Sequence, residues 1–247
     1  MTTMKLTQNS LKKILSLAEK ILRSGGILIC PTDTVYGILG DATNRDAIKK
    51  IFALKTRSAE KKFPIFVKDI PTARKFAYIA DAKAKFLEKV WLAPLETARP
   101  EGPSGAQARA RSLTGPGPLT VVLHHKEKLP KILTPHQSKL GAGQAGGLGT
   151  IGIRIPNHPF LLELLSRLDF PLVQTSANIS GKPPAKNIKE IKEYFGKERL
   201  KPELIIDGGQ IDGTQSTVID FTGNEPILLR TGAISKLELD RLLSGLD

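Results

Sequence analysis

Short apolar runs alternate with amphipathic helical segments along most of this 247-residue chain. Leu11 to Leu22 carries apolar residues at helical spacing, and the following Ser24-Gly25-Gly26 suits a helix C-cap. Ile27 to Cys30 is then a continuous apolar run closed by a proline, which is typical of a buried strand. Repeated alternation of this kind predicts an α/β fold in which helices cover a sheet of mixed strand direction.

The same two patterns recur to the end of the chain, with no internal repeat. After Ile27 to Cys30 we expect a loop and then a helix that opens at Asn44. Further strands are expected at Pro64 to Val67, Leu119 to Leu123, Thr150 to Ile155, Pro171 to Gln174, Leu204 to Ile206, Thr217 to Phe221 and Ile227 to Leu229. Further helices are expected at Ala82 to Trp91, Pro159 to Leu168, Ile188 to Phe195 and Lys236 to Leu243.

Two segments depart from this alternation. Leu92 to Thr114 mixes Ala, Pro, Gly, Arg and Glu without periodicity, and Leu140 to Gly149 carries five glycines in ten residues. We interpret both as loop insertions in one domain that spans residues 1–247, and we expect the first insertion to be mobile.

The only cysteine, Cys30, excludes an internal disulfide framework and a Cys-based zinc cluster. The first nine residues have no apolar core of signal-peptide length, and no run reaches the roughly 18 apolar residues that a membrane span needs. These features predict a cytoplasmic protein without a membrane partner.

The net charge of +13 favours a polyanionic partner, such as nucleic acid or a nucleoside triphosphate. The stretch from Arg45 to Lys75 contains ten basic and three acidic residues, so it contributes +7 of the net charge of +13. A solvated lysine face is the alternative interpretation of such a run.

Polar side chains follow several of the expected strands. Pro31 to Gly37 (PTDTVYG) brings two hydroxyls and a carboxylate beyond a buried strand, where ligands of open α/β sheets bind. Thr175 to Asn178 follows another strand, and Asp207 to Gln210, Ser216 to Val218 and Arg230 lie at further strand ends. The same residue types also suit ordinary turns.

Cations cluster after the second helix, at Lys55-Thr56-Arg57 and Lys61-Lys62. An Arg fork and Lys point charges can clamp a polyphosphate, although they could equally complement the helix dipole. There is no Walker A motif, no Gly-x-Gly-x-x-Gly stands after a strand and before a helix, and there is no Gly-x-Ser-x-Gly elbow around Ser176. We interpret His158 as a structural residue at a helix start.

Taken in order, the motifs PTDTVYG, KTR, GPGPLT, GIRIPNHP, TSANISGKP, DGGQ, STVID and LLRTG resemble the YrdC/Sua5 family of L-threonylcarbamoyladenylate synthases. The resemblance runs from about Ser10 to Ile234 and is to the short, single-domain form. It implies a YrdC-like twisted, open mixed sheet flanked by helices, with a concave basic cavity.

The resemblance also implies a reaction. L-Threonine, bicarbonate and ATP with Mg²⁺ would give threonylcarbamoyl-AMP and pyrophosphate, without a protein-ligated metal. The product would serve a tRNA-modifying threonylcarbamoyl transferase complex that makes N6-threonylcarbamoyladenosine at position 37 of tRNA, and the synthase could itself contact tRNA.

Site roles follow from the motif positions that this chain matches. The L-threonine site would comprise Thr34, Arg154, Ser176 and Ser216. The ATP site would comprise Lys55, Arg57, Lys61, Lys62, Thr150, Asn178, Lys186 and Arg230, with Lys55 and Arg57 as the catalytic pair. An Arg fork suits a carboxylate, and several cations suit a triphosphate.

Two other functions are compatible with the sequence. A non-catalytic RNA-binding module could use the basic stretch, although few aromatic residues are interleaved with its charges. A carbamoyl-transfer domain of the hydrogenase-maturation type would share the fold, although the acylphosphatase-like and zinc-binding segments of such proteins are missing from this sequence.

Overall fold

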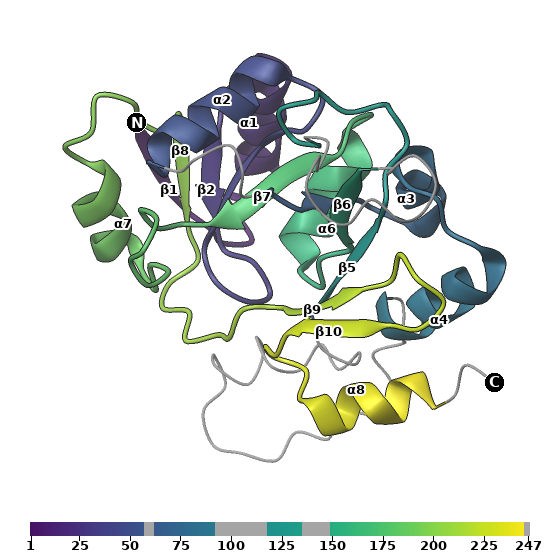
Figure 1. Ribbon diagram of the computed structural model, residues 1–247. Helices are drawn as coiled ribbons and strands as arrows, with labels where there is room; N and C mark the ends of the chain where they lie inside the picture. The colour runs from purple at the N-terminus through teal and green to yellow at the C-terminus, as the bar shows by residue number, and fades with distance from the viewer. Residues whose placement is uncertain (57–61, 92–117, 135–148, 245–247) are drawn as a thin grey trace.

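A computed structural model describes residues 1–56, 62–91, 118–134 and 149–244. In these residues ten strands form one sheet, in the order β1-β8-β2-β3-β7-β4-β6-β5-β9-β10 (Figure 1). The strands are β1 (Thr2–Lys5), β2 (Leu28–Cys30), β3 (Gly37–Asp41), β4 (Ile65–Phe66), β5 (Leu119–His124), β6 (Thr150–Arg154), β7 (Leu172–Ser176), β8 (Leu204–Asp207), β9 (Thr217–Asp220) and β10 (Ile227–Arg230).

The sheet mixes strand directions, as the sequence predicts. β8 lies parallel to both β1 and β2, and the pairs β4–β6 and β5–β9 are also parallel. The remaining neighbours are antiparallel, including β3 with β7, whose register pairs Gly37 with Ser176. This pairing brings the start of β3 beside the end of β7, two points of the chain that both carry predicted site residues.

Seven helices are described, and they cover both faces of the sheet. They are α1 (Leu11–Arg23), α2 (Arg45–Leu54), α3 (Ile70–Phe76), α4 (Asp81–Trp91), α6 (Pro159–Arg167), α7 (Ile188–Phe195) and α8 (Lys236–Leu243). α1 and α6 contribute to one apolar core, with residues such as Leu15 and Leu164. α2, α3, α4, α7 and α8 contribute to a larger core on the other side, with residues such as Ile51 and Phe195.

Every predicted strand and helix is present, with ends within two residues of the expected ones. Three further elements, β1, β3 and α3, were not predicted. β3 contains Gly37 and Gly40, which lower strand propensity, yet its five residues are all buried. α3 has only seven residues, and it starts where Asp69 caps the backbone N–H of Thr72 at 2.7 Å. Segments this short have too little periodicity to identify.

The two predicted insertions, 92–114 and 140–149, lie outside the described residues except for Gly149. Within the described ranges no helix is long and apolar enough to cross a membrane.

Candidate functional site

The loop between β2 and β3 is organised by the side chain of Thr32. Its Oγ1 accepts hydrogen bonds from the backbone N–H groups of Thr34 (3.1 Å) and Val35 (3.3 Å) and donates to Val35 O at 2.7 Å. Oγ1 of Thr34 lies 2.9 Å from Oγ1 of Thr32, and both threonines are buried. These hydrogen bonds hold Thr34 at a defined place in the loop. Thr32 belongs to the PTDTVYG motif but is not among the predicted site residues.

Arg154, at the end of β6, reaches this loop. Its Nη2 lies 2.5 Å from Oδ1 of Asp33 in an ion pair, and its Nη1 is 3.4 Å from Oγ1 of Thr34. The guanidinium carbon stands 5.4 Å from the centre of the Phe66 ring, within range of a cation–π contact. Arg154 is only 2% exposed, so its charge is buried beside the loop. The predicted pair Thr34 and Arg154 is thus brought together.

Arg230 and Ser216 form a second group, on β10 and just before β9. Nε and Nη2 of Arg230 donate to the carbonyl of Ser216 at 3.1 and 2.8 Å, and Nη2 also donates to Ser216 Oγ at 3.2 Å. Ser216 Oγ lies 2.8 Å from Oγ1 of Thr120. Burial, and then the charge of Arg154, lower the pKa of Arg230. β5 lies between β6 and β9, and its Val121 pairs with both Ile153 and Ile219, so the second group lies beside the first.

Lys55 ties a third group together, at the end of β7. Its Nζ donates to Ser176 O (2.6 Å), Asn178 O (2.9 Å) and Asn178 Oδ1 (2.9 Å). Ser176 Oγ also donates to Asn178 Oδ1, at 2.6 Å, and Asn178 Nδ2 donates to Lys182 O at 2.6 Å. Lys55 is 2% exposed. The structure therefore makes this lysine an anchor of the loop after β7.

Two backbone contacts join these groups. Ala177 N donates to Tyr36 O at 2.7 Å, so the loop after β7 is fixed to the end of the Thr34 loop. At Gly213, a Cβ atom would come within 1.8 Å of the carbonyl oxygen of Thr34, so only glycine allows this close approach. The segment after β8 is thereby held against the same loop.

The remaining predicted residues lie as follows. Lys62 Nζ donates to the carbonyl and the hydroxyl of Thr150 at 3.3 and 3.1 Å, and burial lowers its pKa. Lys186 forms an exposed ion pair with Asp212 at 3.2 Å. Arg57 and Lys61 fall outside the described residues.

His158 occupies the N-cap position of α6, as predicted, but its side chain makes no cap hydrogen bond. Burial lowers its pKa, against the opposing influence of the Asp33 carboxylate. His158 is therefore a largely neutral neighbour of the Asp33–Arg154 pair.

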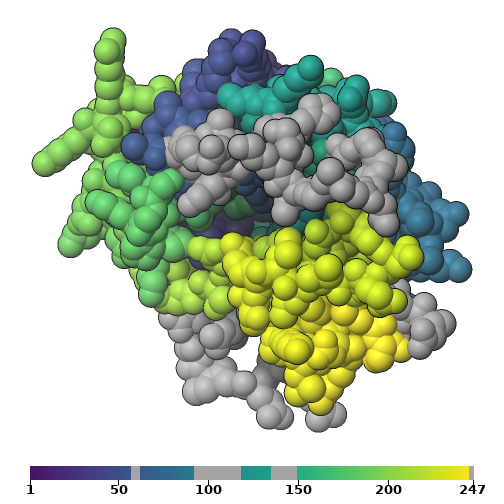
Figure 2. All heavy atoms as spheres, in the orientation of Figure 1, coloured from purple at the N-terminus to yellow at the C-terminus, as the bar shows by residue number. Residues whose placement is uncertain are grey.

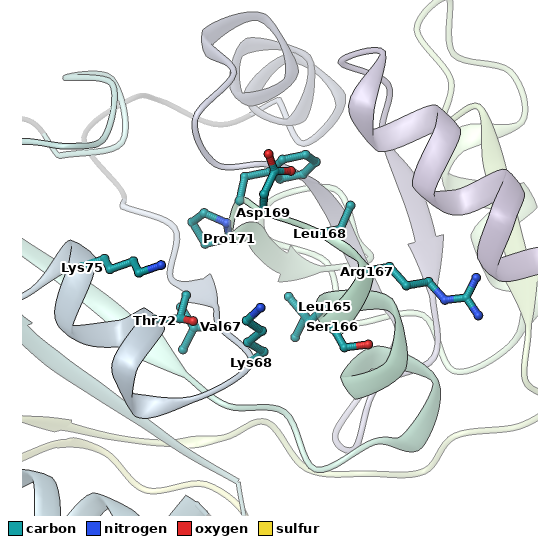
Figure 3. Close-up of a pocket in the computed structure, with 11 residues that line it drawn as sticks. Val67, Lys68, Thr72, Lys75, Leu165, Ser166, Arg167, Leu168, Asp169 and Pro171 are labelled. Carbon is teal, nitrogen blue, oxygen red and sulfur yellow. The ribbon is translucent and has the colours of Figure 1, made fainter.

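In the space-filling view, purple N-terminal residues lie recessed between green and yellow parts of the surface (Figure 2). A different hollow of about 340 Å³ lies between the start of α3 and the end of α6. Figure 3 shows Lys68 and Lys75 beside it and Arg167 turned away. None of the predicted substrate residues lines this second hollow. The candidate site therefore consists of the three connected groups around Arg154, Arg230 and Lys55.

Known proteins match this chain over most of its length. A family model described as "Telomere recombination" (Sua5, YciO and YrdC) matches residues 20–109 and 103–232. The chain is 33% identical to a threonylcarbamoyl-AMP synthase of Pyrococcus abyssi, over 92% of this chain and 56% of that protein. It is 32% identical to a putative threonylcarbamoyl-AMP synthase of Methanocaldococcus jannaschii, over 96% of this chain and 94% of that protein.

A solved structure has the same fold. The crystal structure of Pyrococcus abyssi Sua5 complexed with L-threonine aligns with a TM-score of 0.77 and 30% identity, covering 98% of this chain and 61% of that one. The chain thus spans little more than half the length of the Pyrococcus protein but nearly all of the Methanocaldococcus one.

Proposed function

Because this chain belongs to the Sua5/YciO/YrdC family, we propose that it is a threonylcarbamoyl-AMP synthase. The reaction joins L-threonine, bicarbonate and ATP, with Mg²⁺ arriving on the nucleotide, and releases pyrophosphate. The observation that carries the proposal is the buried guanidinium of Arg154 beside Thr34. Nε and Nη2 of Arg154, which form one edge of the guanidinium, have no hydrogen-bond partner within the described part of the chain.

The L-threonine end of the site is built around that edge. Two parallel N–H donors match the two oxygens of a carboxylate, and a buried donor without a partner carries a penalty that such a ligand would remove. Thr34 offers a hydroxyl next to it, and Ser216 and Ser176 lie in the two neighbouring groups. If the carboxylate of L-threonine binds Arg154, the hydroxyl and amino groups of the same molecule would lie among these polar side chains.

The ATP end is expected on the cationic side of the same site. Arg230, Lys62 and Thr150 lie among the described residues, and Asn178 is held in place by Lys55. Desolvation of both Arg230 and Lys62 strengthens their attraction for a phosphate. We propose that these side chains, together with Arg57, Lys61 and Lys186, line the concave basic cavity that a triphosphate requires.

No protein nucleophile is needed for this reaction. The threonine nitrogen captures CO₂ from bicarbonate as a carbamate, whose oxygen attacks the α-phosphorus as the bond to pyrophosphate breaks. Negative charge grows on the phosphoryl oxygens, so the protein acts by positioning and by placing cations there. We propose that Lys55 contributes by fixing Ser176 and Asn178, and that Arg57 contacts the phosphates directly.

The adenylate is a mixed anhydride and must pass to an acceptor. We propose that a tRNA-modifying threonylcarbamoyl transferase consumes it, with position 37 of tRNA as the final acceptor. In this proposal residues 1–247 form a single domain, with the segments 92–114 and 140–149 as insertions.

The test is to incubate the protein with L-threonine, bicarbonate, Mg²⁺ and ATP and to follow pyrophosphate and threonylcarbamoyl-AMP. Release that depends on both threonine and bicarbonate is expected. Release without threonine, or none at all, would contradict the proposal. Tight RNA binding with a steep salt dependence and no turnover would favour an RNA-binding module instead.

Arginine variants test the assignment of the two substrates. R154Q should mainly raise the KM for threonine, since it removes the carboxylate fork, whereas R57Q should mainly impair the use of ATP. R167Q is the matched control, because Arg167 pairs with Glu163 at the surface of α6 at 2.7 Å. Equal, mild effects of R154Q and R57Q would contradict the assigned roles.

A further inference from the structure

Asp33 carries a mostly buried carboxylate that no motif role accounts for. Its side chain is 9% exposed, and Oδ2 accepts a hydrogen bond from the backbone N–H of Asn157 at 2.9 Å. Asn157 lies just before α6, and Asp33 lies in the loop after β2. The hydrogen bond from Asn157 therefore fixes the carboxylate of Asp33 independently of its ion pair with Arg154.

The other oxygen of Asp33 faces Arg154. Oδ1 lies 2.5 Å from Nη2, yet the two atoms are not aligned as a hydrogen bond, and neither has another hydrogen-bond partner among the described residues. Among the described residues the guanidinium also has a long hydrogen bond to Thr34 and a contact with the face of the Phe66 ring. Of these contacts, the one with Asp33 is the shortest, so Asp33 most restrains where the Arg154 guanidinium lies.

The charges around this pair do not cancel. Burial, and then the charge of Arg154, lower the pKa of Arg230, and Asp33 is the one carboxylate that pairs with Arg154 in the described part of the chain. Arg154 is buried and Arg230 is more exposed, and two guanidinium groups with one carboxylate leave a positive excess at the site. An incoming carboxylate would balance that excess, so Asp33 need not leave when the substrate binds.

We propose that Asp33 is a positioning residue, which holds the Arg154 guanidinium so that its Nε–Nη2 edge receives the carboxylate of an amino acid substrate. The inference rests on the proposed function and deepens it. The chain of restraint runs from Asn157 N–H to Asp33 and from Asp33 to Arg154. A guanidinium without this carboxylate would be a buried, uncompensated cation free to turn away from the ligand.

The test is D33N, which keeps the size of the side chain and an oxygen for Asn157 N–H but removes the charge. We expect the KM for threonine to rise by about tenfold to a hundredfold, because a small misplacement of a binding group is costly. The KM for ATP and kcat should change by no more than about threefold. D33E, which restores the charge one methylene further out, should recover part of the loss.

D41N is the matched control. Asp41 is also a buried aspartate, 8% exposed, but its Oδ1 accepts from the backbone N–H and the hydroxyl of Thr43, both at 2.7 Å. If these carboxylates matter only for folding, D33N and D41N should both lower the melting temperature, and both should keep the wild-type KM for threonine. A rise in that KM for D33N alone supports positioning.

A double-mutant cycle shows whether Asp33 acts through Arg154. D33N should have little further effect in an R154Q background, because its target is already gone. Additive effects of the two changes would overturn the inference. Should D33N fail to fold, D33S replaces it, because it also removes the carboxylate, and a normal KM for threonine in folded D33S contradicts positioning.

Calorimetric binding of L-threonine separates this inference from the proposed function. If wild type and D33N bind threonine equally well, the result contradicts the inference about Asp33 and leaves the proposed function intact. Wild-type protein that neither binds threonine nor turns it over contradicts the proposed function and removes the basis of the inference with it.

Discussion

At the scale of single residues, the site depends on buried cations whose partners differ. Arg154 keeps one edge without a hydrogen-bond partner in the described residues, whereas Nζ of Lys55 donates to three oxygens of the loop after β7. A cation with unused N–H donors is suited to a ligand, and one that donates to several oxygens of a loop is suited to holding that loop. The motifs KTR and GIRIPNHP do not separate these two uses, because each places a cation at the end of a helix or strand.

Lys55 leads to a prediction about stability. K55M removes the ammonium that satisfies buried oxygens of Ser176 and Asn178, so we expect the free energy of unfolding to fall by about 2–4 kcal/mol. Urea unfolding followed by circular dichroism measures the change. K49M, in the helix that ends just before Lys55, is the control, since Lys49 is exposed and pairs with Asp46 at the surface, and it should stay within about 0.5 kcal/mol of wild type. Equal stability of K55M and K49M would contradict the anchoring role.

At the scale of elements, the sheet ends where its C-terminal strands meet α8. Thr217 in β9 is fully buried, and its Oγ1 donates to Ile234 O at 2.6 Å while it accepts from Gly232 N and Ile234 N, both at 3.0 Å. α8 itself starts with a capping box between Ser235 and Glu238, and it buries only Leu239. The side chain of Thr217 thus fixes the segment just before α8 to the sheet.

T217V should loosen that attachment. Loss of the hydroxyl leaves three backbone groups without their partner, so the free energy of unfolding should fall by about 2–4 kcal/mol. Amide hydrogen exchange should become faster from Gly232 through α8, while β3 and β7 keep their protection. T217S keeps the hydroxyl and is expected to retain slow exchange there. Unchanged protection of α8 in T217V would show that other contacts hold the helix.

The elements also show where local patterns stop being informative. β2 and α1 are recognisable because an apolar run and a helical period each extend over several residues. β3 is not, since its residues Gly-Ile-Leu-Gly-Asp fit a loop as well as a strand. It becomes a strand because β2 and β7 supply backbone partners on both sides.

At the scale of the whole molecule, one sheet separates two apolar cores. Leu164 of α6 belongs to the core of α1 and α6, and Ile51 of α2 belongs to the larger core opposite. Both side chains are fully buried. Both cores pack against the same strands. Loss of packing on one face of the sheet would therefore also weaken the strands that support the other core.

Cooperative unfolding is therefore expected. L164A and I51A should each lower the free energy of unfolding by about 2–5 kcal/mol, the usual cost of truncating a large buried aliphatic side chain. Both should do so in a single transition that tryptophan fluorescence of Trp91 and far-ultraviolet circular dichroism report alike. Two separate transitions in either variant would show that the two faces unfold independently.

The sequence by itself determined the class of fold, most of the element positions, the family and the identity of the candidate residues. Those properties follow from periodicity and from motifs a few residues long. Only the tertiary structure decided strand order, the strand identity of β3, and which residues meet. Thr34 and Arg154 lie 120 positions apart, and Lys55 reaches an acceptor 121 positions away. The carboxylate of Asp33 likewise pairs with Arg154 only after folding, because side-chain contacts of this range depend on how the strands are ordered and not on any local pattern.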